Sequence, residues 1–236
     1  MSQIKALAFD VGGSVFDWKS SVIRGIESLT QARGVAIDSE AFAMGWRLRK
    51  FQTLMQVKQG AVSRMNADQI LRYTLDGLLG DFPSLNLSDE EKDQLMTVWH
   101  KMPVWNEFPE ALEKLKSRYT VFVLTILSMA IVVDCSKFNG ITWDAIISCE
   151  FLNHYKQDPG AYIKGAELLG LKPEEVLMVA VHPSDIEAAQ RAGMKAAFVE
   201  PKTSEPDVPG LSFPPKYDQY DYCAQTFMDL ADQLCK

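Results

Sequence analysis

The sequence lacks a long apolar run, since no stretch of about 18 residues is apolar enough to suggest a membrane span. Its N-terminus has no basic segment leading into an apolar one, so we expect no signal peptide. Its four cysteines have neither CxxC spacing nor the density of a disulfide framework. We therefore expect a cytoplasmic chain with reduced thiols.

Basic residues are fewer than acidic ones, with 24 Lys and Arg against 31 Asp and Glu, which gives a net charge of −7. This balance argues against nucleic acid or an anionic membrane as a partner. Three scattered histidines offer no zinc site, and there are no internal repeats. The 236 residues, 47% of them hydrophobic, suffice for one large domain or for a domain with a smaller insert.

The first informative stretch is residues 4–14, which we interpret as a buried strand followed by a tight turn. Asp10 ends the apolar run, and Gly12 and Gly13 follow it. Glycines allow other atoms to approach closely. In an open parallel sheet, reacting groups gather at the carboxyl ends of the strands, so Asp10 is a candidate site residue.

Residues 16–99 carry helical periodicity without a strand signal, which predicts an all-helical domain. A first helix ends at Gly34, a second starts near Ser39, and a third runs from Asn66 to Gly80. Ser88 and Glu91 have the spacing of a capping box and open a fourth.

From about residue 110 the pattern alternates between helices and strands. The predicted strands are Tyr119–Leu127, Ala145–Cys149, Glu175–Val181 and Met194–Val199; the predicted helices are Pro109–Ser117, one from near Met129, one from Asp158-Pro159, Pro183–Ala192 and Asp221–Leu234, with a loop at Pro201–Pro215. Such alternation gives a parallel sheet. We predict an α/β protein with a Rossmann-like core (residues 1–15 and 100–236) and a helical cap (16–99) inserted after the first strand.

Four polar residues fall near predicted strand ends: Asp10, Thr125, Lys156 and Asp185. Two carboxylates at one sheet edge repel each other, and one is pushed toward protonation unless a cation lies between them. Lys156 can supply that positive charge.

This order of residues resembles the haloacid dehalogenase superfamily, and more narrowly the type II L-2-haloacid dehalogenases. The resemblance covers nearly the whole chain and rests on five local markers: Phe-Asp-Val-Gly-Gly-Ser at 9–14, Trp46-Arg47, Tyr-Lys-Gln-Asp-Pro at 155–159, Tyr162, and His-Pro-Ser-Asp at 182–185. It implies that Asp10 is a nucleophile that attacks substrate carbon and forms an ester, which water then hydrolyses.

The resemblance also implies roles for further residues. Ser14 would hold an oxygen of the nucleophile by a hydrogen bond. Arg47 matches a cap arginine that faces the substrate carboxylate or the departing halide, which suits its forked cationic group. Tyr162 matches a family tyrosine, and His182 is a candidate hydrogen-bonding group in the pocket.

The sequence departs from the family pattern at several positions. An aromatic residue is usual where this chain has Gly12, and the second strand end usually reads Ser or Thr, Asn, Gly, whereas here it reads Thr-Ile-Leu at 125–127. Ile126 therefore replaces an amide, and Ala180 replaces a hydroxyl-bearing residue. Gln157 replaces a proline. We expect weak turnover, or an altered substrate range with Gly12 opening space for a bulkier group.

The phosphatases of the superfamily need an acid two residues after the nucleophile and a further carboxylate four residues before Asp185. This chain has Gly12 and Val181 there, so one side of a magnesium site is missing. We expect no metal and no cofactor.

We predict a metal-independent hydrolytic dehalogenase that acts on small 2-haloalkanoic acids, with a small anionic substrate. The resemblance is compatible with a homodimer. Two alternatives remain open at this point: a related hydrolase of another electrophile, less favourably a phosphatase, and a non-catalytic binding protein.

Overall fold

The computed structural model describes residues 3–203 and 214–236, and the chain divides into two compact units. The α/β unit consists of Met1–Phe16, Val104–Met129 and Gly140–Lys236. The helical unit consists of Asp17–Pro103 and Ala130–Asn139. The chain thus enters the helical unit soon after its first strand. The assignment of residues 1–15 with 100–236 as a core domain and of 16–99 as a cap stays a prediction.

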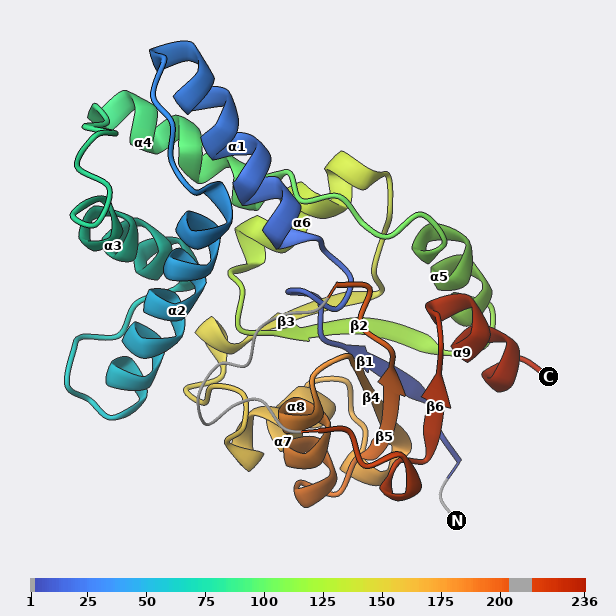
Figure 1. The fold of residues 1–236 in the computed structure, drawn as a ribbon. Helices are drawn as coiled ribbons and strands as arrows, with labels where there is room; N and C mark the ends of the chain where they lie inside the picture. The colour runs from blue at the N-terminus through green and yellow to red at the C-terminus, as the bar shows by residue number, and fades with distance from the viewer. Residues whose placement is uncertain (1–2, 204–213) are drawn as a thin grey trace. The chain divides into compact units, whose positions relative to one another are not determined.

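The described part of the α/β unit contains one parallel sheet of six strands in the order β3-β2-β1-β4-β5-β6 (Figure 1). The strands are β1 (Ala6–Phe9), β2 (Thr120–Thr125), β3 (Ala145–Ser148), β4 (Val176–Ala180), β5 (Lys195–Val199) and β6 (Tyr222–Ala224). β1 is buried along its whole length. This central strand is apolar throughout because both of its faces are covered.

Helices of this unit pack in two pairs. The first pair is α5 (Phe108–Lys116) and α9 (Phe227–Leu234), and the second is α7 (Pro159–Glu167) and α8 (Pro183–Arg191), on the other side of the sheet in Figure 1. Phe9 of β1 packs against Phe108 and Phe227, with ring centroids 5.9 Å away in both cases. The apolar faces of α5 and α9 are thereby buried against the centre of the sheet.

The chain adds strands on one side of β1 first and then, in a reversal of direction, on the other, so its neighbours are β2 and β4. In open parallel sheets, ligand sites form outside the carboxyl ends of the strands at such a reversal. Asp10 follows β1 directly, so the topology alone places it at this position.

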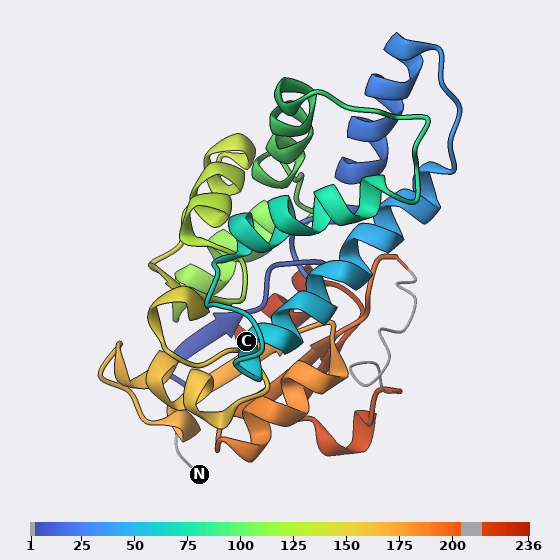
Figure 2. The same cartoon turned by 90° about the vertical axis from the view of Figure 1, so that its left-hand side faces the viewer.

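The helical unit contains α1 (Trp18–Arg33), α2 (Ser39–Lys58), α3 (Ala67–Leu79), α4 (Asp89–Met96) and most of α6 (Met129–Asn139). Figure 2 shows α2 and α3 side by side. Asp17, Asp38, Asn66 and Ser88 cap the first four helices, because the side chain of each accepts an otherwise unpaired backbone N–H. The helical unit also contains the short 3-10 helix η1 (Thr97–His100), and the α/β unit contains η2 (Cys149–Phe151), η3 (Pro173–Glu175) and η4 (Tyr217–Gln219).

The predicted α/β class with a helical segment after the first strand is confirmed, as are the helix starts at Ser39 and Asn66 to within a residue. The helix predicted over Asp221–Leu234 is partly wrong, because its first residues form β6 and the helix begins at Phe227. The second strand ends at Thr125, two residues earlier than predicted. Most of the predicted loop Pro201–Pro215 lies outside the described residues.

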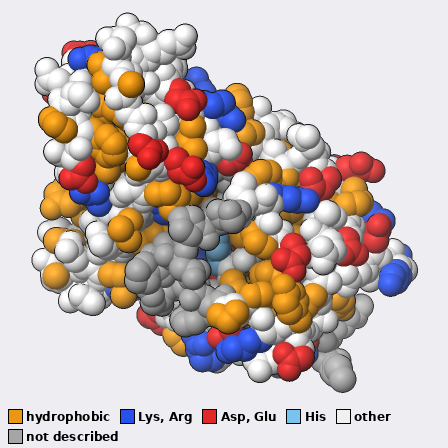
Figure 3. Space-filling model, viewed as in Figure 1, with side chains coloured by type: hydrophobic (Ala, Val, Ile, Leu, Met, Phe, Trp, Pro, Cys, Tyr) orange, Lys and Arg blue, Asp and Glu red, His pale blue; other side chains and the backbone are white. Residues whose placement is uncertain are grey.

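Charged side chains of both signs are scattered over the face in Figure 3, and ion pairs such as Lys195–Asp221 join neighbouring elements at the surface. Within residues 3–203 and 214–236, the structure has no helix that is both long enough and apolar enough to cross a bilayer.

His100 connects two helices of the helical unit. Its Nδ1 lies 2.8 Å from Asp134 of α6, and its Nε2 lies 2.7 Å from Asp68 of α3. The hydrogen bonds to Asp68 and then to Asp134 outweigh the opposing effect of burial, so the pKa of His100 is raised above its ordinary value.

Because the folded-state pKa is raised, protonated His100 stabilises the fold fully below the pKa of the unfolded chain, and this stability is lost as pH rises through the folded-state pKa. We expect the wild type to exceed His100→Gln in unfolding free energy by up to about 1 kcal/mol near pH 5.5. The gap should close near pH 9. Urea unfolding at both pH values measures it, with His154→Gln as the control. A gap that is independent of pH would contradict the prediction.

Candidate active site

The turn after β1 positions Asp10 and Ser14. Gly13 has φ 93°, a backbone conformation that favours glycine, and its N–H donates to the carbonyl of Phe16 at 3.1 Å. Val15 and Phe16 both donate their N–H groups to the carbonyl of Val11. The chain therefore folds back on itself directly after Asp10.

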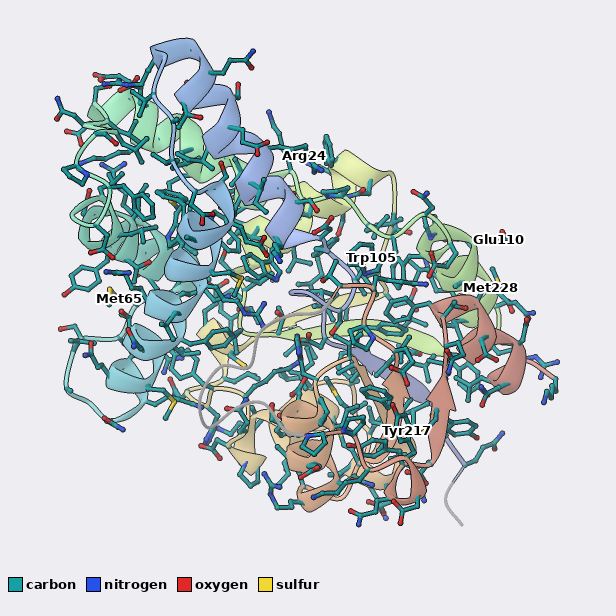
Figure 4. All side chains as sticks on the ribbon, in the orientation of Figure 1. Arg24, Met65, Trp105, Glu110, Tyr217 and Met228 are labelled. Carbon is teal, nitrogen blue, oxygen red and sulfur yellow. The ribbon has the colours of Figure 1, made fainter. Side chains whose placement is uncertain are left out.

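Ser14 is fixed from three directions. Its hydroxyl donates to Oδ2 of Asp10 at 2.6 Å and accepts the backbone N–H of Val181 at 3.3 Å. Its carbonyl accepts the indole N–H of Trp105 (labelled in Figure 4) at 2.8 Å. Val181 thus contributes through its backbone at the position where a phosphatase has a carboxylate.

Lys156 lies between the two buried carboxylates. Its Nζ donates to Oδ1 of Asp10 at 2.9 Å and to Oδ2 of Asp185 at 2.6 Å. All three side chains are less than a tenth exposed. The structure therefore brings together the three groups that sequence reasoning placed at one sheet edge.

Tyr162 joins the loop that carries Lys156 to Asp185. Its fully buried hydroxyl donates to Oδ1 of Asp185 at 2.6 Å and accepts the backbone N–H of Gln157 at 3.3 Å. Gln157 has φ 68°, which is strained for a residue other than glycine. A proline at this position has no N–H and a fixed negative φ, so the departure from the family pattern permits this hydrogen bond.

The loop then enters α7 by ordinary capping chemistry. Asp158 accepts the N–H of Gly160 at 2.9 Å, and Pro159 takes the first helical position, where no N–H is needed. The short stretch 155–159 therefore fixes both the start of α7 and the position of Lys156.

Burial and nearby charges shift the pKa values of the two carboxylates in opposite directions. Burial raises the pKa of Asp10, but the charges of Lys156 and His182 and the hydrogen bonds from Ser14 and Lys156 outweigh it, so the pKa of Asp10 is lowered. The pKa of Asp185 is raised, chiefly by burial and also by the charge of Asp10, against the opposing effect of Lys156. Burial tends to lower the pKa of Lys156, yet the two carboxylates raise it. Asp10 is thus the carboxylate held in its ionised form.

Thr125 is buried at the end of β2, and its hydroxyl oxygen accepts the N–H of Leu127 at 3.1 Å. This bond shapes the turn that carries Ile126 and Leu127. Ile126 is half-buried, and Ala180 is fully buried at the end of β4. Neither offers a polar side chain to a ligand.

Leu127 borders the position of Gly12, and our expectation that Gly12 opens room for a bulkier group stays a prediction. A Cβ atom at Gly12 would lie 3.5 Å from Cδ1 of Leu127. A side chain at position 12 would therefore contact Leu127. Sequence reasoning noted both departures but not their contact, which depends on how two strand ends face each other.

His182 precedes α8 and lies next to Asp10. Its Nε2 is 3.9 Å from Oδ2 of Asp10 and 3.4 Å from the carbonyl oxygen of Gly12, and 28% of its side chain is exposed. It is the most exposed of the titratable side chains that the structure brings to Asp10.

Arg47 belongs to the helical unit. It is buried, and its guanidinium carbon lies 4.8 Å from the ring centroid of Trp18 and 5.3 Å from that of Phe51. Its contact with a substrate stays a prediction. Among the residues that the structure describes, no group of three or more His, Cys, Asp or Glu side chains is arranged to hold a metal ion.

The sequence matches the model of one protein family, the haloacid dehalogenase-like hydrolases, over residues 4–193. The chain belongs to this family. It is a hydrolase whose matched region includes the whole Asp10, Lys156 and Asp185 cluster.

Individual relatives agree with this membership. (S)-2-haloacid dehalogenase 4A of Burkholderia cepacia is 26% identical over 247 residues, which cover 100% of this chain and 99% of that protein. The crystal structure of the defluorinating L-2-haloacid dehalogenase Rha0230 is 30% identical with a TM-score of 0.88, covering 99% of this chain and 96% of that chain. A phosphoglycolate phosphatase of Aquifex aeolicus is 27% identical over 157 residues, 60% of this chain and 72% of that protein.

The contact between Gly12 and Leu127 in this hydrolase is testable by a double-mutant cycle. Gly12→Ala meets only ordinary van der Waals contact, so we expect an unchanged melting temperature. Gly12→Phe collides with Leu127 and should lose about 1–3 kcal/mol. Combining it with Leu127→Gly should recover part of that loss, giving a favourable coupling energy in thermal unfolding. Strictly additive effects would show that the two side chains do not share this space.

Proposed function

We propose that this hydrolase is a metal-independent dehalogenase of small 2-haloalkanoic acids that works through an ester on Asp10. The observation that carries the proposal is the arrangement around Asp10: an ionised carboxylate at the carboxyl edge of the sheet, with Lys156 donating to one oxygen and Ser14 to the other. The dehalogenase names of the full-length relatives support the same reaction class.

In the first step, a carboxylate oxygen of Asp10 attacks the carbon that bears the halogen. A bond forms between this oxygen and carbon, the carbon–halogen bond breaks, and halide leaves with the electron pair. The lowered pKa keeps Asp10 in the anionic form that this attack requires.

In the second step, water attacks the carbonyl carbon of the Asp10 ester. One oxygen of Asp10 is esterified, and the other keeps its donor, either Ser14 or Lys156. That donor stabilises the negative charge that develops on the oxygen. Collapse of the intermediate breaks the ester carbon–oxygen bond and releases the 2-hydroxy acid, and loss of one proton to solvent restores the carboxylate of Asp10.

We expect substrate to be held weakly. The resemblance gives Arg47 as the group for the substrate carboxylate, whereas Ile126 and Ala180 offer it no hydrogen bond. Each missing hydrogen bond to a charged group costs about 1.5–3 kcal/mol, so slow turnover with a high KM is the expected outcome. The cytoplasmic location and the homodimer also stay predictions.

We propose a reaction without a metal ion because each carboxylate oxygen of Asp10 and Asp185 already accepts a hydrogen bond. Oδ1 and Oδ2 of Asp10 accept from Lys156 and Ser14, and those of Asp185 accept from Tyr162 and Lys156. The position that would add a third carboxylate is Val181, an apolar residue. A magnesium ion prefers several oxygen ligands in octahedral geometry.

Replacing the nucleophile tests the covalent step. Asp10→Asn should lower chloride release from chloroacetate by roughly 10⁴-fold or more. After many turnovers of the wild type in ¹⁸O-water, mass spectrometry should find ¹⁸O in the peptide that contains Asp10, because the hydrolytic oxygen enters that carboxylate. Asp232→Asn, an exposed change on α9, is the matched control. Label in the product alone, with Asp10 unlabelled, would rule out the ester.

Metal dependence can be measured independently. Chloride release should survive dialysis against EDTA and gain nothing from added magnesium, while hydrolysis of p-nitrophenyl phosphate should stay at background in both conditions. Magnesium-dependent phosphate release would overturn the proposal in favour of the phosphatase alternative. Absence of every activity, with a folded protein, would favour the non-catalytic alternative.

A further inference from the structure

One oxygen of the Asp10 carboxylate depends on the position of a turn. Lys156 donates to Oδ1 at 2.9 Å, and the hydroxyl of Ser14 donates to Oδ2 at 2.6 Å. Only one side-chain torsion separates the hydroxyl of a serine from its backbone, so a shift of the backbone moves this donor directly. The backbone of Ser14 must therefore be held in place if both oxygens of Asp10 are to keep their donors.

The carbonyl of Ser14 is bound by a residue far away in the sequence. Within the turn, Val15 and Phe16 donate to the carbonyl of Val11, and Gly13 donates to that of Phe16. The carbonyl of Ser14 accepts the indole N–H of Trp105 at 2.8 Å, across 91 positions of the chain. This hydrogen bond fixes the peptide group that directly follows the hydroxyl-bearing residue.

Trp105 itself is held by its neighbours on both sides. Val104 forms an antiparallel bridge with Phe16 at the end of the turn. The carbonyl of Trp105 accepts the N–H of Phe108, the first residue of α5, at 2.9 Å. Phe108 in turn packs against Phe9, the residue before Asp10. The indole, labelled in Figure 4, thus extends toward Ser14 from a backbone that is anchored to α5 and to the turn.

We propose that Trp105 is a positioning residue for the nucleophile, because its indole N–H holds the backbone of Ser14 where the hydroxyl reaches Oδ2 of Asp10. The catalytic consequence rests on the proposed function. Trp105 exchanges no proton and forms no bond to substrate; it acts through Ser14 alone. Misplacement of a reacting group by about 1 Å can lower a rate by about 10²-fold, so a loosened donor is expected to slow the attack by Asp10.

The charges that face Asp10 give this inference a readout without turnover. Burial raises the pKa of Asp10, but the charges of Lys156 and His182 and the hydrogen bonds from Ser14 and Lys156 lower it. Asp185 lies on the far side of Lys156. Weakening the hydrogen bond from Ser14 leaves these charged groups in place and raises the pKa of Asp10.

The kinetic test removes the indole N–H and keeps an aromatic ring. Trp105→Phe should lower kcat for chloroacetate about tenfold and change KM less than about twofold, because it alters the nucleophile and leaves the binding of substrate unchanged. In a Ser14→Ala background the same change should have no further effect, since both changes remove one hydrogen bond. An unchanged kcat in Trp105→Phe, or additive losses in the double variant, would overturn the inference.

The second test is an NMR titration of protein labelled with ¹³C at its aspartate carboxyl groups. The signal that is missing in Asp10→Asn identifies Asp10. Its pKa should be higher than in the wild type in both Ser14→Ala and Trp105→Phe. An unmoved titration in Trp105→Phe refutes the inference alone. If the titration moves but the wild type forms no ester with chloroacetate, the proposed function is refuted and the structural part of the inference stands.

Trp143→Phe is the matched control, since Trp143 is a tryptophan of the same unit that packs against Phe9 and Phe108. It should lower the melting temperature without changing kcat or the titration of Asp10, which separates positioning from a general loss of packing. Circular dichroism verifies folding, and Trp105→Leu replaces Trp105→Phe in both tests if the latter does not fold.

Discussion

The structure of this site depends on one buried ammonium group. Lys156 holds Asp10 and Asp185 at 2.9 and 2.6 Å, where two carboxylates without a cation would repel each other. Loss of one partner from a buried ion pair typically costs about 3–5 kcal/mol, because the other charge is left uncompensated. The turn after β1, the loop before α7 and the start of α8 are therefore linked through a single nitrogen atom.

The hydrogen bonds around this ion cluster give the two carboxylates different properties. Asp10 lies beside two donors and His182, and its pKa is lowered. The pKa of Asp185 is raised, mainly by burial. Tyr162 links Asp185 to the backbone of Gln157. A preorganised arrangement of this kind requires little movement when charge develops in a reaction.

Much of this architecture follows from the sequence, because strand periodicity and the rule for parallel sheets place Asp10, Lys156 and Asp185 at one edge. Other features could not be predicted from the sequence. β6 has three residues, too few for a periodic signal, so the helix predicted for this stretch covered β6 together with α9. The contacts of Leu127 with Gly12, and of Trp105 with Ser14, join distant residues without a local pattern. The role of Arg47 stays a prediction because it belongs to the other compact unit.

The position of β1 has a consequence for biosynthesis. This strand ends at Phe9, yet its partners are Thr120–Thr125 and Val176–Ala180. A ribosome makes the chain from its N-terminal end, so this fully buried strand is made before either of its neighbours. Pairings of such long sequence separation form slowly. The nascent chain thus exposes an unpaired strand edge, a surface that chaperones bind and that crowded expression conditions turn into aggregates.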